Sequence, residues 1–209
     1  GNWDNQNESD KIKKALSNIN QEDKMKNKLK ESARRYIDNL KIPEQLPVIE
    51  SKYIERVIGL AKFSARMRGV VDRDKYSGMV MYKPSSEIGT RLAKQLTKLG
   101  TGIAIFLNKD RIDNETYRLM KRVALDTIPD RAEEIVRTLW ELNGISGKEI
   151  STSIIVDKTR LPMTTVFRVL QDLVLLKIVD RIGTNKARWS LTSSIVELIK
   201  KGHIYPESE

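Results

Sequence analysis

Thr164, Arg168 and Gln171 are spaced i, i+4 and i+7, so on a helix they form one polar stripe. Hydroxyl, guanidinium and amide groups are the side chains that suit base edges and phosphates, and we add the neighbouring Thr165 to these candidate contacts. Apolar residues at helical spacing occupy another side of the same helix: Val166, Val169, Leu170 and Leu173. The pattern predicts an amphipathic helix that presents its polar stripe to DNA.

A basic hairpin is predicted directly after this helix. Helical periodicity ends near Lys177, and extended runs then flank turn residues at 183–186. The hairpin would carry Asn185, Lys186 and Arg188 at or near its tip, where we expect them to contact the DNA backbone. From residue 160 to residue 190 there are six basic residues and two acidic ones, so the positive surplus is local.

Two helices are predicted upstream, over 130–142 and 148–156, followed by a turn at 158–161. The resulting order of helix, helix, turn, helix and hairpin resembles the winged helix-turn-helix family. The resemblance implies that the third helix enters the major groove and that the hairpin, or wing, lies along the backbone. Winged helices also serve as protein-binding modules, so a protein-interaction adaptor is one alternative.

Composition narrows the class of protein. The chain has 209 residues, a net charge of +10 and a pI near 9.7, which favours two small domains and an anionic partner. We expect nucleic acid rather than an acidic membrane, because no amphipathic segment pairs a basic face with Trp or Phe. No apolar run approaches the ~20 residues of a membrane span either. Cysteine is absent and His203 is the only histidine, so zinc fingers, disulfides and Cys/His catalytic pairs are excluded. A soluble, cytoplasmic protein is expected.

Most of the positive charge lies outside the winged-helix segment, since residues 1–130 carry 26 basic and 18 acidic side chains. Helices are predicted over 24–40 and 51–68, and prolines at 43 and 47 mark a connector. The second of these helices has a basic side, which is either a binding surface or an ordinary solvated face. It comprises Lys52, Arg56, Lys62 and Arg66.

Residues 70–84 are expected to form a hairpin or a loop around Ser77-Gly78. A further helix is predicted from Ser86, although Gly100 and Gly102 leave open a strand over 103–107. Its apolar side is Leu92, Leu96, Leu99 and Ile103, and its basic stripe is Arg91, Lys94 and Lys98. Asp113 is predicted to cap the next helix, with Ile112 and Tyr117 as a hydrophobic staple, and Pro129 to end it.

The run from Glu87 to Pro129 resembles the C-terminal lid of AAA+ ATPases of the minichromosome-maintenance-like helicase branch, which mobile elements also encode. Arg91 stands in the place of the sensor-2 arginine, and 112–115 matches the cap of the next helix, with Asn114 and Glu115 replacing the usual acids. In such ATPases a winged helix follows the lid directly. The alternative for Arg91 is an ordinary arginine at a helix start.

The chain departs from that family in one large respect, because it contains no G-x-x-x-x-G-K-[ST] phosphate loop. The nearest run, 144–149, lacks the spacing and the hydroxyl residue. We therefore expect no enzymatic activity and no cofactor in this chain. The resemblance implies a larger parent protein that binds ATP and magnesium, with the missing ATPase core and a second copy of the chain as partners. The start at Gly1 rather than Met fits a fragment.

The predicted fold is mainly α: a small helical bundle like an AAA+ lid, followed by a winged helix-turn-helix domain. The segments are 1–50 (helical segment and connector), 51–129 (lid-like domain), 130–203 (winged helix) and 204–209 (tail). The expected function is the DNA-binding C-terminal region of a replication ATPase or helicase. The alternative is a free-standing winged-helix transcription regulator, whose first domain would dimerise or bind an effector.

Overall fold

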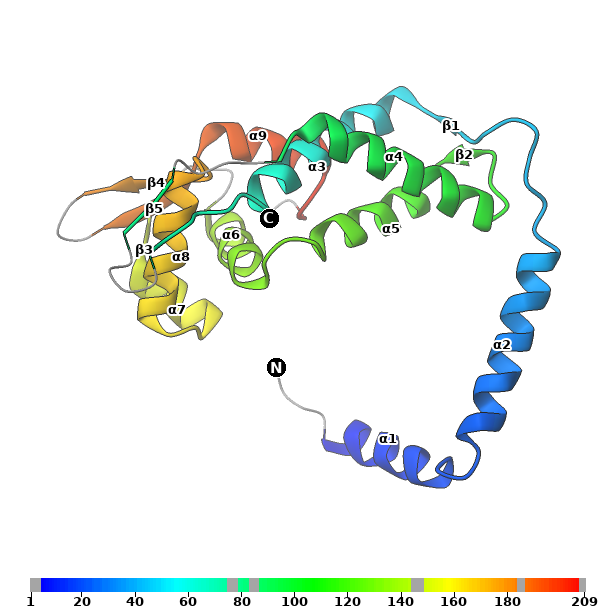
Figure 1. Ribbon diagram of the computed structural model, residues 1–209. Helices are drawn as coiled ribbons and strands as arrows, with labels where there is room; N and C mark the ends of the chain where they lie inside the picture. The colour runs from blue at the N-terminus through cyan, green and yellow to red at the C-terminus, as the bar shows by residue number, and fades with distance from the viewer. Residues whose placement is uncertain (1–4, 75–78, 83–86, 144–148, 184–186, 207–209) are drawn as a thin grey trace. The chain divides into compact units, whose positions relative to one another are not determined.

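The computed structural model describes residues 5–74, 79–82, 87–143, 149–183 and 187–206. These residues are mainly helical, and their strands form two small sheets (Figure 1). It divides into two compact units, Gly1–Pro43 and Glu44–Glu209. Within the described ranges no helix combines the length and apolar character that a membrane span requires.

The first unit consists of two helices, α1 (Asn5–Ser17) and α2 (Glu22–Asp38). The helix predicted over 24–40 is α2, which ends where the side-chain amide of Asn39 donates to the carbonyl of Arg35 (2.7 Å). None of the residues of α2 is buried, and Leu29 is 72% exposed. The apolar positions of this helix therefore have no core of their own.

The second unit begins with three helices and a short parallel sheet. Their bounds are β1 (Val48–Ile49), α3 (Ser51–Met67), α4 (Gly89–Phe106), β2 (Arg111–Ile112) and α5 (Asn114–Leu125). The helix predicted over 51–68 is α3. The helix predicted from Ser86 begins only at Gly89, and Ser86 itself lies outside the described residues.

Residues 103–106 belong to α4, so the helix rather than the strand alternative is confirmed. Packing explains how the helix tolerates Gly100. A Cβ atom at this position would collide with Sδ of Met120, so glycine permits the close approach of α4 to α5. The close packing of α4 against α5 offsets the free-energy cost of a glycine within the helix.

The remaining elements follow the predicted order, with one additional strand and one additional helix. They are α6 (Asp130–Asn143), β3 (Ile150–Ser151), α7 (Thr152–Thr159), α8 (Met163–Leu175), β4 (Val179–Ile182), β5 (Arg188–Leu191) and α9 (Ser193–Gly202). The three strands form an antiparallel sheet in the order β3-β5-β4. Figure 1 shows α8 lying beside the hairpin of β4 and β5.

The second helix of this segment, predicted over 148–156, is displaced. Ile150 pairs with Trp189 in the sheet, so the backbone stays extended there and α7 begins only at Thr152. The helix then continues to Thr159, and the predicted turn over 158–161 is a turn over 160–162. Arg160 ends α7 in the left-handed conformation, with φ of 55° and its N–H bonded to the carbonyl of Val156 (2.7 Å).

Helix α9 packs against α3, where a Cβ on Gly59 would lie 2.6 Å from the backbone nitrogen of Gly202. The hydroxyl of Tyr117 donates to the carbonyl of Gly202. Ile204 and Tyr205, predicted to begin a tail, are buried. The boundary predicted between 129 and 130 consequently lies inside the second unit, whose two halves share one hydrophobic core.

Candidate nucleic-acid interface

Helix α8 has one buried side and one polar side, as its spacing predicts. Val166, Leu170 and Leu173 are almost completely buried. On the polar side Thr164 and Arg168 are exposed, and the neighbouring Thr165 is half-buried. Arg168 forms no ion pair with any side chain that the structure describes, so its guanidinium is available to a ligand.

The hairpin of β4 and β5 is fixed to the helices by Trp189, which is fully buried. Its indole Nε1 donates to the hydroxyl of Thr152 (2.8 Å), and its ring meets Phe167 of α8 edge-on, with centroids 6.0 Å apart. The guanidinium of Arg181 lies 5.8 Å from the Phe167 ring and 5.9 Å from the Trp189 ring. One hydrogen bond and a set of ring contacts thus hold the hairpin against α7 and α8.

The sequence did not single out Trp189 or Arg181 as site residues. A lone tryptophan in an extended run is a usable signal for an anchor, since its large ring needs a core and its N–H needs an acceptor. The position of Arg181 opposite Trp189 depends on strand register, which the sequence alone did not define.

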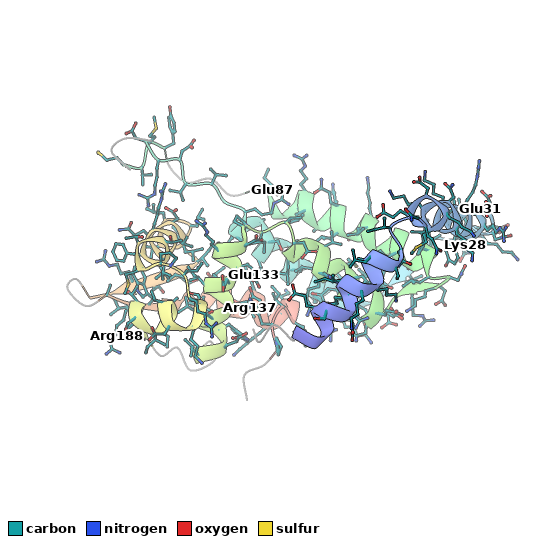
Figure 2. All side chains as sticks on the ribbon, turned by 90° about the horizontal axis from the view of Figure 1, so that it is seen from below. Lys28, Glu31, Glu87, Glu133, Arg137 and Arg188 are labelled. Atoms are coloured by element: carbon teal, nitrogen blue, oxygen red, sulfur yellow. The ribbon has the colours of Figure 1, made fainter. Side chains whose placement is uncertain are left out.

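Of the three residues predicted near the hairpin tip, only Arg188 is described. It is exposed, and in Figure 2 its side chain points away from the helices. It alternates with the buried Trp189 along β5, which places it on the outward face of the sheet. Asn185 and Lys186 lie outside the described residues.

Gln171 differs from the other predicted base contacts, because it is half-buried at the end of the polar side of α8. It lines a pocket of about 280 Å³ that also includes a chain segment preceding α4. The other lining residues are Arg73, Val80, Val174, Leu175, Arg181 and Trp189. Next to it, the carboxylate of Asp172 accepts hydrogen bonds from Nε (2.8 Å) and Nη2 (2.6 Å) of Arg73.

Arg91 is exposed near the start of α4 and has no ion-pair partner among the described side chains. Its predicted neighbours Lys94 and Lys98 instead line a groove of about 380 Å³ between α4 and α3. Among the described residues, no ion pair or hydrogen bond joins the side chain of Arg91 to α8. The two predicted sites are therefore separate features of the second unit.

The basic side predicted for α3 is largely engaged with other groups. Lys52 pairs with Glu50 (3.1 Å), and Arg66 donates to the hydroxyl of Ser194 (2.9 Å). The guanidinium of Arg56 lies over the rings of Tyr53 and Tyr117. The basic side of α3 was predicted to be either a binding surface or an ordinary solvated face. These contacts favour the ordinary face.

Comparison with known proteins yields no relative: no protein-family model matches the chain, and neither a curated protein nor a solved structure does. In the part of the chain that the structure describes, no three histidine, aspartate or glutamate side chains come together in a way that could hold a metal ion. Function is therefore inferred from the geometry and charge of the α8 region.

Proposed function

We propose that residues 130–203 form a winged helix-turn-helix module that binds duplex DNA. Helix α8 would enter the major groove and the β4–β5 hairpin would lie along the backbone. The observation that carries this proposal is the exposed pair Thr164 and Arg168, which lies opposite the buried side of a helix that Trp189 ties to a basic hairpin. The three-residue turn between α7 and α8 is typical of helix-turn-helix motifs.

Charge supports the same partner. Basic side chains exposed around α8 and the hairpin are Arg160, Arg168, Lys177, Arg181 and Arg188. The acidic Asp172 is engaged by Arg73, which leaves Asp180 as the exposed acid between residues 160 and 183. A rigid guanidinium such as that of Arg168 suits the paired acceptors of guanine, whereas the other cations suit phosphates.

Fluorescence anisotropy of a labelled duplex tests the proposal. The chain should bind at ~50 mM salt and lose most of its affinity by ~200 mM, because each phosphate contact releases counterions. Arg168→Ala should weaken binding about tenfold. Arg118→Ala is the matched control, since Arg118 is also an exposed helical arginine but lies on α5. Absence of binding at the lower salt concentration would overturn the proposal.

We further propose that residues 51–129 are the lid of a replication ATPase, with the winged helix as its DNA-binding end. The proposal rests on the resemblance of the run from Glu87 to Pro129 to such lids. The exposure of Arg91, without an ion-pair partner in the described part of the chain, supports it. Arg91 would approach the phosphates of a nucleotide held by an ATPase core. The sequence has no phosphate loop, so this chain alone should neither hold nor hydrolyse ATP.

A further inference from the structure

Helices α3 and α4 lie side by side in the second unit (Figure 1). A Cβ on Gly89 would lie 3.4 Å from Cγ of Lys62, which places the start of α4 near the end of α3. The two helices therefore run in opposite directions. Between them is a groove of about 380 Å³, which we call the α3–α4 groove. Its apolar lining is Ile49, Ile54, Val57, Ile58 and Ala93.

Large apolar side chains are exposed in this groove and at both of its ends. Ile54, within the lining, is 41% exposed. Val48 precedes the lining residue Ile49 at one end and is 66% exposed, whereas Ile88, just before α4 at the other end, is 72% exposed. From Ile88 to Lys98 the chain rises about 15 Å, which is nearly three turns of helix. Exposed apolar side chains that gather in this way indicate a contact surface.

Two lysines follow one edge of the α3–α4 groove. Lys94 and Lys98 both line it, and both are exposed. They are four residues apart on α4, so their side chains lie one turn apart on the same side of the helix. Neither forms an ion pair with a side chain that the structure describes. The edge of the groove is therefore positively charged.

Three carboxylates adjoin residues of the groove in the sequence, and each is already paired with a cation from outside it. The pairs are Glu50 with Lys52 (3.1 Å), Glu55 with Lys201 (2.5 Å) and Glu87 with Arg68 (3.3 Å). These acids consequently do not balance the charge of Lys94 and Lys98. An apolar lining with unbalanced cations along one edge is complementary to an amphipathic helix that carries carboxylates beside its apolar side.

The charge of the groove also distinguishes between possible partners. Helices α1 and α2 have exposed apolar residues, but both are net positive: α1 has three basic and two acidic side chains, and α2 has six and four. A second copy would therefore bring positive helices to a positive edge. Phosphates of a nucleic acid would pair with the lysines but would leave the apolar lining exposed, whereas an acidic protein helix satisfies both.

We propose that the α3–α4 groove binds an acidic amphipathic helix of another protein. A helix of about three turns would place apolar side chains at i, i+3, i+4 and i+7 over Ile54 and Ile58. Carboxylates one turn apart beside that apolar side would face Lys94 and Lys98. Neither the DNA-binding role of α8 nor the ATPase role of Arg91 enters this proposal.

The test uses a synthetic helical peptide of about 14 residues, with leucines at those four positions and glutamates beside them. The chain has no cysteine, so the substitution Thr90→Cys, at an exposed position that lines the groove, gives a unique site for a solvent-sensitive dye. Titration of the labelled full chain with the peptide should give a saturable change in fluorescence. The same dye on Ser153→Cys, at an exposed position of α7, should not respond.

Charge reversal locates the contact. Lys94→Glu combined with Lys98→Glu should weaken peptide binding at least ~10-fold, because carboxylates would then face carboxylates. Lys24→Glu combined with Lys28→Glu is the matched control: it makes the same change of charge at the same spacing on α2 and should leave binding unchanged. Ile54→Ser should weaken binding about 5-fold through loss of apolar contact.

A change in the peptide provides a measurement that does not depend on the folding of any variant. Replacing its glutamates by glutamines should weaken binding to the unsubstituted chain at least ~5-fold. Equal affinity for the two peptides, or no saturable signal from the dye at position 90, would overturn the proposal. So would an equal loss of affinity in the α2 control. If the chain dimerises in sedimentation experiments and Ile54→Ser makes it monomeric, the groove is a contact between copies and the proposal is also overturned.

Discussion

Two regions of the second unit, the α8–hairpin region and the α4–α5 region, each contain an amphipathic helix. They differ in the elements that lie next to the exposed side of that helix. Both helices have a buried apolar side and a polar one: α8 exposes Thr164 and Arg168, and α4 exposes a stripe of basic residues, Arg91, Lys94 and Lys98. The hairpin is held against α7 and α8 through Trp189, and the segment before α4 is joined to α8 by the ion pair of Arg73 with Asp172. Beside Lys94 lies a groove with apolar residues of α3. The surroundings of an exposed basic residue therefore depend on the neighbouring elements, and the spacing of residues along its own helix does not define them.

The largest expected effect is on the anchor of the hairpin. Trp189→Ala should lower the free energy of unfolding by about 3 to 5 kcal/mol, because it removes a fully buried ring and leaves the Thr152 hydroxyl without its donor. Chemical unfolding followed by circular dichroism measures the loss. Phe106→Ala in α4 is the control: Phe106 is 49% exposed, and its substitution should cost far less. Equal losses would show that the hairpin is not anchored through Trp189.

Trp189 also illustrates how far the sequence could predict this fold. Helices α6 and α8 and the hairpin were predictable because their apolar spacing is local. The pairing of Ile150 with Trp189 was not, since a two-residue strand has no periodicity and its partner is distant in the sequence. Displacement of α7 to Thr152 follows from that missed pairing.

The candidate site was predictable to a similar extent. The exposure of Thr164 and Arg168 follows from helical spacing, and the sequence identified both. The partial covering of Gln171 depends on Arg73 and Val80 of the segment before α4 and on the bond from Arg73 to Asp172, which joins residues 99 positions apart. No local pattern encodes such a contact. Likewise, the burial of Ile204 and Tyr205 depends on the docking of α9 against α3.

Arg91→Ala tests the role that we propose for α4 in ATP hydrolysis. In a protein that includes the proposed ATPase core, this change should reduce ATP hydrolysis by at least ~10²-fold, the scale of one lost transition-state charge contact. Affinity for DNA should not change, because Arg91 lies on α4, outside the proposed DNA-binding module. Lys94→Ala serves as the control for loss of a neighbouring positive charge, and should leave hydrolysis near its original rate. If Arg91→Ala hydrolyses ATP normally but binds DNA weakly, the roles that we assign to α4 and α8 are wrong.

Substitutions at Arg168 and Arg188 should separate base recognition from backbone contact in the α8–hairpin region. Arg168→Ala should cost about 1 to 3 kcal/mol of binding free energy and relax sequence preference, because a guanidinium on a base edge discriminates between bases. Arg188→Ala should weaken binding to all sequences evenly and reduce the salt slope by about 1, as expected for a phosphate contact. Anisotropy over a panel of duplexes and salt concentrations measures both quantities. Equal loss of sequence preference in the two variants would contradict this division.

The smallest effect is expected in the α4–α5 region, where Asp113 caps α5 by accepting a hydrogen bond from the N–H of Thr116 (3.0 Å). Asp113→Ala should lower the free energy of unfolding by about 1 kcal/mol. Asp113→Asn should recover most of this loss, since an amide oxygen also caps, although the ion pair with Lys109 (2.6 Å) is removed. Thermal unfolding at neutral pH ranks the three proteins.

The same carboxylate makes the stability of this region depend on pH. The hydrogen bond from Lys109, followed by that from the backbone of Thr116, lowers the pKa of Asp113 from its usual 3.8 to about 2. A lowered pKa in the folded state means that the charged carboxylate stabilises the fold fully above about pH 4 and progressively less as the pH falls toward 2. The difference in unfolding free energy between the unsubstituted chain and Asp113→Asn should therefore shrink over this interval. A difference that stays constant from pH 5 to pH 2 would show that the charge of Asp113 contributes nothing beyond its role as a cap.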